Sequence, residues 1–418
     1  MNFTGCPDCL YHRKVKFLSS LLLLSTLSFP AGAEDAQLIE IRSILQKARA
    51  EAAQHSETRG ASPEFTTVKH QLRDWIESHL TRLTGDSGEM EKTELVAELN
   101  AALKQAHLLC GTEPECSTND RTRLGFLGDI RIDLRQRDTF LVLQTAVGVE
   151  CGYDESAYVY TWRNGKWNWI WQSEQNHYTK DEYAVQTLHA VLLSPSLREG
   201  APLILTLGSE PWCSSNWHSV YYRLWRTYSE DYPPKLLLNG EELAFLGNHD
   251  IPIQGSVGRE DALIEFSAAS KDPGVQNRPA VRHYAVHGNT VERIGPIALS
   301  PRDFSEEWLA NPWEQSKLWS QTSSLAALQH EHDVVLSGAD HGEFAATTHC
   351  TDSPDLWQVV FDTADKKKGT IYFLIRWEPP YRFTMVRVSD HASPGCTEKD
   401  PGADEERRTL FPGQNLFE

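Results

Sequence analysis

Long apolar runs and positive charge are both scarce in this chain of 418 residues. Beyond residue 33 no stretch approaches the ~20 apolar residues that a membrane-spanning helix needs, so we expect no membrane insertion. Acidic side chains outnumber basic ones by 58 to 40, which gives a net charge of -18. Because such a chain repels nucleic-acid phosphates and anionic lipid surfaces, we expect no nucleic-acid partner.

Complete catalytic motifs are also missing. The sequence has no G-x-S-x-G nucleophile elbow, no phosphate-binding P-loop and no dinucleotide-binding glycine pattern after a strand. Its acidic runs lack the alternating ligands and the glycine of a calcium loop. We therefore expect no cofactor, and a divalent metal is the alternative considered below.

Residues 1–33 have the pattern of a secretory signal peptide. Three basic residues precede an apolar run over 17–29, and small residues at 31–33 follow as a cleavage site. The apolar run is too short to span a bilayer comfortably, and no cysteine follows it for lipid attachment. We expect an exported protein, periplasmic or extracellular, that begins near Glu34.

Residues 34–118 are predicted to form a helical N-terminal region, because apolar residues recur there at three- and four-residue steps. Ser62-Pro63 is a capping residue followed by a first-turn proline, which marks the start of the second helix. The region either caps the rest of the protein or binds a partner, and we favour the cap. The three stripes are Leu38, Ile41, Leu45, Ala48 and Ala52; Phe65, Val68, Leu72, Trp75, Ile76, His79 and Leu83; and Leu95, Leu99, Ala102, Leu103 and Ala106.

Six aromatic residues surround one Asn-Gly pair in the stretch AYVYTWRNGKWNWIW, residues 157–171. Asn164-Gly165 predicts a two-residue hairpin, and side-chain alternation then places all six rings on one face. We interpret that face as a packing layer; the alternative is a ligand-binding platform that stacks on sugars. The expected cross-strand pairs are Trp162 with Trp167, Tyr160 with Trp169, and Tyr158 with Trp171.

From about residue 119 to 390 the sequence predicts short strands, arranged as four copies of four consecutive strands. The second strands of the copies begin near residues 140, 203, 262 and 356, and a helical insert at about 300–337 lengthens the last spacing. Such repeats are typical of propeller blades. We predict a mainly β fold with a helical N-terminal region and a β-propeller-like repeat, with a β-sandwich or stacked sheets as alternatives. Residues 391–418 are expected to form a polar C-terminal tail.

Six cysteines follow residue 33, and an even number in an oxidising compartment favours disulfides. Two of them follow the second strands of neighbouring copies, and two others flank the last copy. The expected pairs are Cys110–Cys116, Cys151–Cys213 and Cys350–Cys396.

The tetrapeptide GNHD at residues 247–250 resembles one motif of the calcineurin-like metallophosphoesterases. In that family the Asn and His ligate a metal, so the resemblance implies a metal role for Asn248, His249 and Asp250. The family's other motifs are missing, since no Asp-x-His precedes the tetrapeptide and no Gly-His-x-His follows it. We interpret the stretch as the turn between the second and third copies.

A second group of histidines and acids lies in and beyond the helical insert. Imidazoles and carboxylates suit zinc or a similar ion. The run HEHD, residues 330–333, lacks the full His-x-His-x-Asp-His order of the metallo-β-lactamase group. We interpret the group as solvated, with a divalent metal site as the alternative. Its members are His330, His332, Asp333, Asp340, His341 and His349.

Adjacent carboxylates at Asp154-Glu155 and Asp181-Glu182 could serve a glycosidase, although adjacent acids are expected by chance in so acidic a chain. Taken together, the sequence favours a non-catalytic binding or scaffold protein for a protein or glycan ligand. The alternative is a secreted hydrolase, a glycosidase or a metal-dependent phosphoesterase, with its site on the loops between strands. The oligomeric state stays open.

Overall fold

The computed structural model describes residues 35–54, 62–86, 88–109, 123–135, 139–149, 152–176, 178, 186–195, 202–210, 215–228, 233–245, 253–272, 275–336, 342–363 and 369–399. The expected signal peptide lies outside these ranges. Met1–Asp35 and Ala36–Glu418 are separate units, and every element named below belongs to the second. Among the described helices, none combines the length and the apolar character that crossing a membrane requires.

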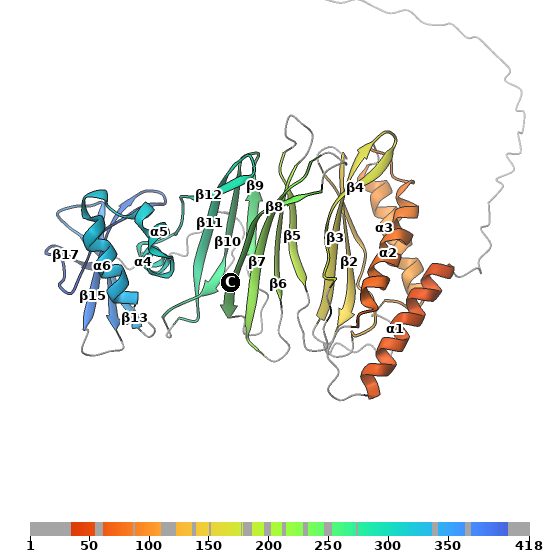
Figure 1. The fold of residues 1–418 in the computed structure, drawn as a ribbon, viewed down its shortest axis with the longest axis horizontal. Coiled ribbons are helices and arrows are strands. Elements are labelled where there is room, and N and C mark those ends of the chain that lie inside the picture. The colour runs from red at the N-terminus through yellow and green to blue at the C-terminus, as the bar shows by residue number, and fades with distance from the viewer. Residues whose placement is uncertain are drawn as a thin grey trace, which may run out of the picture. The chain divides into compact units, whose positions relative to one another are not determined.

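Three helices open this unit: α1 (Ala36–Gln54), α2 (Phe65–Leu80) and α3 (Glu89–Gln105). The predicted stripes are their buried faces, since Ile41, Leu72 and Leu99 are each almost fully buried. The same hydrophobic cluster includes side chains of the first sheet, among them Leu141 and Tyr160. The helices therefore pack on that sheet, with α2 and α3 drawn beside it in Figure 1.

The β-region repeats one simple order, in which strands that are adjacent in sequence pair antiparallel. The predicted starts of the second strands coincide, within one residue, with those of β2, β6, β10 and β14. The described sheets contain four or five strands, and none closes into a barrel. Sheet A contains β1 (Arg131–Arg135), β2 (Phe140–Val149), β3 (Gly152–Arg163) and β4 (Lys166–Ser173); sheet B contains β5 (Thr187–Leu193), β6 (Leu203–Glu210), β7 (Trp217–Arg226) and β8 (Lys235–Phe245). Sheet C contains β9 (Ile253–Val257), β10 (Asp261–Ala269), β11 (Asn277–His287) and β12 (Thr290–Ile294); sheet D contains β13 (Gly342–Cys350), β14 (Leu356–Thr363), β15 (Thr370–Glu378), β16 (Arg382–Ser389) and β17 (Cys396–Lys399).

Sheets A, B and C pack face to face in sequence order (Figure 1). Val159 and Trp171 of sheet A share a cluster with Ile204 and Tyr221 of sheet B. The other face of sheet B packs on sheet C through a separate cluster. Because both faces of sheet B are covered, its inner strands are apolar on both sides, as the burial of β6 shows.

The predicted insert contains α4 (Pro301–Ala310), α5 (Trp313–Ser316) and α6 (Leu325–Leu336). Ser300 caps α4 as expected, since its hydroxyl accepts a 3.1 Å hydrogen bond from the backbone N–H of Asp303. Phe304 and Trp308 of α4 share a core with sheet D. Helix α4 is therefore packed inside the fold, whereas most side chains of α6 are exposed or half-buried.

The Asn-Gly hairpin forms as predicted, with Asn164 at φ 55° and Gly165 at φ 74°. Trp162 pairs with Trp167, and Tyr160 pairs with Trp169. The third expected pair is wrong, because the register shifts and Val159, in place of Tyr158, pairs with Trp171. One extra residue in β4 forms a bulge, so the side chains beyond it point to the opposite faces of the sheet from those expected. Trp171 consequently lies on the opposite face from Tyr158.

One expected disulfide, Cys350–Cys396, is confirmed. It joins the end of β13 to β17, a fifth strand that the sequence did not predict within the expected tail. The other four cysteines of the expected scheme, Cys110, Cys116, Cys151 and Cys213, lie outside the described residues.

Removing this disulfide should lower the stability of the protein. The bridge spans 46 residues, so its loss in Cys350→Ser/Cys396→Ser should cost about 2–4 kcal/mol through the added freedom of the unfolded chain. Denaturant unfolding of wild type and variant under oxidising conditions measures the difference. The matched control is Thr351→Val, which removes only a 3.2 Å side-chain hydrogen bond between the same two segments. Equal midpoints for wild type and the double serine variant would contradict the expectation.

Candidate functional site

Four of the six predicted aromatic residues lie between sheet A and the N-terminal helices. Tyr158 and Tyr160 are buried, and the Tyr160 hydroxyl donates a 2.7 Å hydrogen bond to Glu77 of α2. The indole of Trp167 donates to the Leu83 carbonyl at 2.8 Å. Trp162 packs so closely on Gly85 that a Cβ at that position would overlap its ring. These rings contribute to packing between the sheet and the helices.

Trp171 and Trp169 differ from the other four. Trp171 is buried between sheets A and B. Trp169 is 46% exposed, and the guanidinium of Arg73 lies 5.0 Å from the centre of its ring. Its indole N–H donates to the Trp171 carbonyl at 2.9 Å. Of the six rings, Trp169 is the most accessible to a ligand.

Truncating Trp169 should therefore have a small effect on stability. Trp169→Ala removes a half-exposed ring and one hydrogen bond, and we expect a loss of about 1 kcal/mol. Trp171→Ala removes a fully enclosed ring and should cost several times more. Thermal and denaturant unfolding of both variants gives the comparison. A larger loss for Trp169→Ala than for Trp171→Ala would show that the exposed ring has a role in the core.

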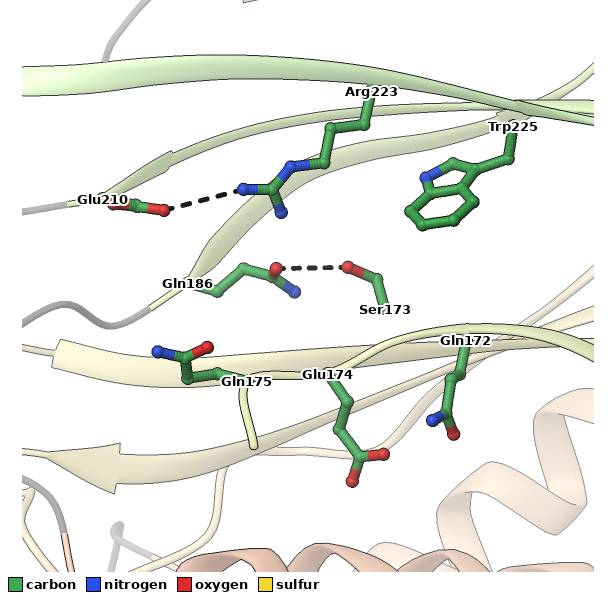
Figure 2. A pocket seen from close by; sticks show the side chains of 8 residues that line it. All are labelled: Gln172, Ser173, Glu174, Gln175, Gln186, Glu210, Arg223 and Trp225. Atoms are coloured by element: carbon green, nitrogen blue, oxygen red, sulfur yellow. Dashed lines mark hydrogen bonds and ion pairs between the residues drawn. The ribbon is translucent and has the colours of Figure 1, made fainter. Parts of the chain in front are cut away.

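The cleft between sheets A and B, called the A/B cleft below, is small and mostly polar (Figure 2). Its volume is about 190 Å³. In the close-up, Ser173, Gln186 and Arg223 approach one another across the gap, and Gln172 and Glu174 point away toward the helices. Its lining residues are Gln172, Ser173, Glu174, Gln175, Gln186, Glu210, Arg223 and Trp225.

The polar side chains of the A/B cleft are held in place by a few hydrogen bonds. Ser173 donates to the Gln186 side chain at 3.1 Å, and Gln186 donates to the Glu155 carbonyl at 3.1 Å. Arg223 donates through Nε to Asn239 at 3.0 Å, and its terminal nitrogen lies 3.8 Å from Glu210. Within the described part of the chain, the buried indole N–H of Trp225 has no hydrogen-bond acceptor. The cleft thus presents positioned donors beside an aromatic ring.

The carboxylate pair Asp154-Glu155 lies beside this cleft, and both side chains have structural partners. Asp154 is buried and accepts hydrogen bonds from Lys69 at 2.6 Å, from the Tyr178 hydroxyl and from the backbone N–H of Gln186 at 3.2 Å. Glu155 accepts from the backbone N–H of Leu188 and from Arg131. Burial raises the pKa of Glu155, although these two partners oppose the change. Asp181 and Glu182 lie outside the described residues.

Of the predicted histidine group, His332 and His349 have local partners, and the interpretation of the group as solvated is wrong for His332. His332 is buried on α6, and its Nε2 lies 3.2 and 3.1 Å from the carbonyl oxygens of Trp308 and Asn311. Its ring packs against the Trp308 indole at 4.8 Å. His330 is exposed on the same helix, and Nε2 of His349 lies 3.0 Å from the Pro354 carbonyl oxygen. His332 therefore holds α6 against α4.

Other predicted metal ligands, namely Asn248, His249, Asp250, Asp340 and His341, fall outside the described ranges. Within those ranges, no group of three or more His, Cys, Asp and Glu side chains is arranged to hold a metal ion. The metal hypothesis at residues 248–250 and 340–341 stays a prediction.

A second buried cluster, the Glu307 network, joins three parts of the fold. Glu307 of α4 has a side chain only 1% exposed and accepts hydrogen bonds from Arg278 at 2.8 Å and Arg293 at 2.6 Å. Arg282 forms an ion pair with Glu307 at 3.0 Å and a two-point contact with Glu242 of β8 at 2.5 and 2.6 Å. Burial would raise the pKa of Glu307, but the three arginines outweigh it and hold that pKa well below its ordinary value.

Comparison of the chain with models of known protein families and with curated protein sequences gave no match. Function is therefore inferred from the chemistry of the described residues.

Proposed function

We propose that this chain is an exported, non-catalytic binding protein with a propeller-like arrangement of its sheets, and that its ligand is a glycan held at the A/B cleft. One observation carries the proposal: an arginine, an indole N–H that has no acceptor among the described residues, and the side-chain amides of Gln175 and Gln186 line one cleft. Sugar hydroxyls both donate and accept hydrogen bonds, so they are matched by such a mixed set. A protein ligand is the other outcome of the test.

The contacts of Asp154 and Glu155 argue against hydrolysis by this predicted carboxylate pair. Glycoside hydrolysis needs two carboxyl groups facing each other across the substrate, one of them free to donate a proton. Asp154 is occupied by Lys69, Tyr178 and the Gln186 backbone, and Glu155 by Arg131 and the Leu188 backbone. In these positions both carboxylates stabilise the junction of helix α2 with sheets A and B.

Export is supported by two independent features. The first 33 residues have the composition of a signal peptide. The Cys350–Cys396 disulfide is compatible with an oxidising compartment, in which such bonds persist.

The proposal is tested by screening protein purified from an oxidising compartment against an array of defined glycans. Arg223→Gln should weaken binding of any glycan that scores by about tenfold, the loss of one charge-assisted hydrogen bond. Arg382→Gln, whose side chain is exposed on β16, is the matched control and should bind like wild type. Melting curves of both variants check that the fold is kept.

Three results would count against the proposal. No binding across the array would remove the glycan ligand and favour a protein partner. Binding unchanged by Arg223→Gln would remove the A/B cleft as the site. Release of smaller sugars from a bound glycan would favour the hydrolase alternative.

A further inference from the structure

A larger cleft lies between sheets B and C at the edge of α4, and is called the B/C cleft below. Its volume is about 460 Å³, within the ~300–1,000 Å³ range of small-molecule pockets. One wall is apolar and contains Tyr222, Leu243, Ala268 and Tyr284, with the two tyrosine rings 6.4 Å apart. The rest of the lining includes the Glu307 network, and the Tyr222 hydroxyl donates a 3.1 Å hydrogen bond to Glu242 of that network. The cleft thus combines a ring-sized apolar surface with a charged one.

The side chains that line the B/C cleft include one more basic residue than acidic residues. The basic members are Lys271, Arg278, Arg282 and Arg293, and the acidic members are Glu242, Glu306 and Glu307. The whole chain has a net charge of -18, so its composition alone would predict a negative lining. A small anion inside the cleft would therefore be attracted by the net positive charge of its lining.

Two guanidinium donors that line the cleft have no acceptor in the described part of the chain. The Nε atoms of Arg278 and Arg293 are buried and make no hydrogen bond with the described residues; the Arg278 Nε lies 3.5 Å from Glu306, at ion-pair distance only. Arg282 differs, because its Nε and terminal nitrogens are engaged by Glu242, Glu307 and the Val281 carbonyl. A buried donor left unpaired is destabilising, and a ligand oxygen would provide the missing acceptor.

We propose that the B/C cleft is a second binding site, for a small ring-bearing carboxylate. The carboxylate oxygens accept from the free arginine donors, with Lys271 at the mouth adding attraction. The ring of the ligand packs against Tyr222 and Tyr284. An acidic sugar and an aromatic acid share this chemistry. This site is separate in position from the A/B cleft, and the two share no lining residue.

The test uses full-length exported protein and isothermal titration with glucuronate and with benzoate. Glucose and benzyl alcohol are the neutral counterparts of the two probes. We expect at least one carboxylate to bind, its neutral counterpart to bind more weakly, and affinity to fall with added salt. Binding by glucuronate alone or by benzoate alone identifies the class of ring that the tyrosine wall accepts.

Two variants locate the binding. Lys271→Gln should weaken binding by about fivefold to tenfold, since it removes one exposed charge and leaves the Glu307 network intact. Lys235→Gln, an exposed residue at the start of β8 outside the cleft, is the matched control. Arg278→Lys, which keeps the charge and removes the free Nε donor, should weaken binding further in protein whose melting curve shows that it is folded.

The proposal is overturned if neither carboxylate binds at millimolar concentration, or if the neutral counterparts bind equally well. It is also overturned if Lys271→Gln and folded Arg278→Lys both bind like wild type. Arg223→Gln keeps the two proposals distinct: it should leave carboxylate binding unchanged, and a loss there would place the anion in the A/B cleft instead.

Discussion

Glu307→Gln should lower the free energy of unfolding by about 3–5 kcal/mol, the cost of breaking a buried ion pair by removing one partner. In wild type this carboxylate lies within 3.0 Å of donors from Arg278, Arg282 and Arg293. Glutamine has a similar shape but carries no charge, so three buried guanidinium groups would share fewer acceptors. Urea unfolding followed by circular dichroism measures the loss.

The pH dependence of the unfolding free energy provides an independent check on the role of Glu307. Because the folded pKa of Glu307 lies well below 4.5, its contribution to stability is complete above about pH 4.5 and is lost as the pH falls toward the folded pKa. The glutamine variant lacks this titration. The difference in unfolding free energy between wild type and Glu307→Gln should therefore shrink as the pH falls below about 4.5.

The control for Glu307 comes from the same insert. Glu314 of α5 pairs with Lys317 at the surface, and its side chain is 77% exposed. Glu314→Gln should cost less than about 1 kcal/mol, because exposed ion pairs contribute little. A loss for Glu307→Gln no larger than that of Glu314→Gln would mean that the arginines find other partners.

The Glu307 network explains why helix α4 of the insert is packed inside the fold. Arg278 and Arg282 lie on β11, Arg293 on β12 and Glu242 on β8, so one side chain of α4 contacts sheet C directly and sheet B through Arg282. Phe304 and Trp308 of the same helix pack into the core with sheet D. Helix α4 thus joins sheet D to sheets B and C, and a 3.2 Å hydrogen bond from the Phe344 backbone N–H of β13 to Asp272 adds a direct contact.

The order of elements could be predicted because it depends on local patterns. Period-two alternation and the Asn164-Gly165 turn are encoded within a few residues, so the strands and the hairpin were found. The register of β4 could not be predicted in the same way. A one-residue bulge at Ile170 depends on how Trp171 packs between two sheets, which is a tertiary effect.

The A/B and B/C clefts could not be predicted from the sequence for a related reason. Short runs such as GNHD and HEHD resemble metal-binding motifs because their polar residues are adjacent in sequence. In the fold, however, His332 of HEHD packs against Trp308 as a core residue. The Glu307 network joins residues 242, 278, 282, 293 and 307 from four elements, β8, β11, β12 and α4, and no local spacing indicates that they meet. One signal was present: Lys69 occupies a position on the apolar face of α2, three residues before Leu72 and four after Phe65.

Lys69→Met should also lower the free energy of unfolding by about 3–5 kcal/mol, because it leaves the Asp154 carboxylate buried without a counter-charge. The side chains of Lys69 and Asp154 are both 0% exposed, and Lys69 also donates to the Gln175 carbonyl at 3.1 Å. Methionine keeps the length of the side chain and its packing. Denaturant unfolding at neutral pH measures the loss.

Two further variants separate the charge from the packing. Lys69→Met combined with Asp154→Asn should recover most of the loss, since the introduced amide oxygen can still accept from the Gln186 backbone and no lone charge stays buried. Lys47→Met, on the exposed face of α1, is the matched control and should change stability by less than about 1 kcal/mol. If the double variant were no more stable than Lys69→Met, the cost would lie in packing at α2. Recovery in the double variant would instead show that one buried ion pair joins the N-terminal helices to sheet A.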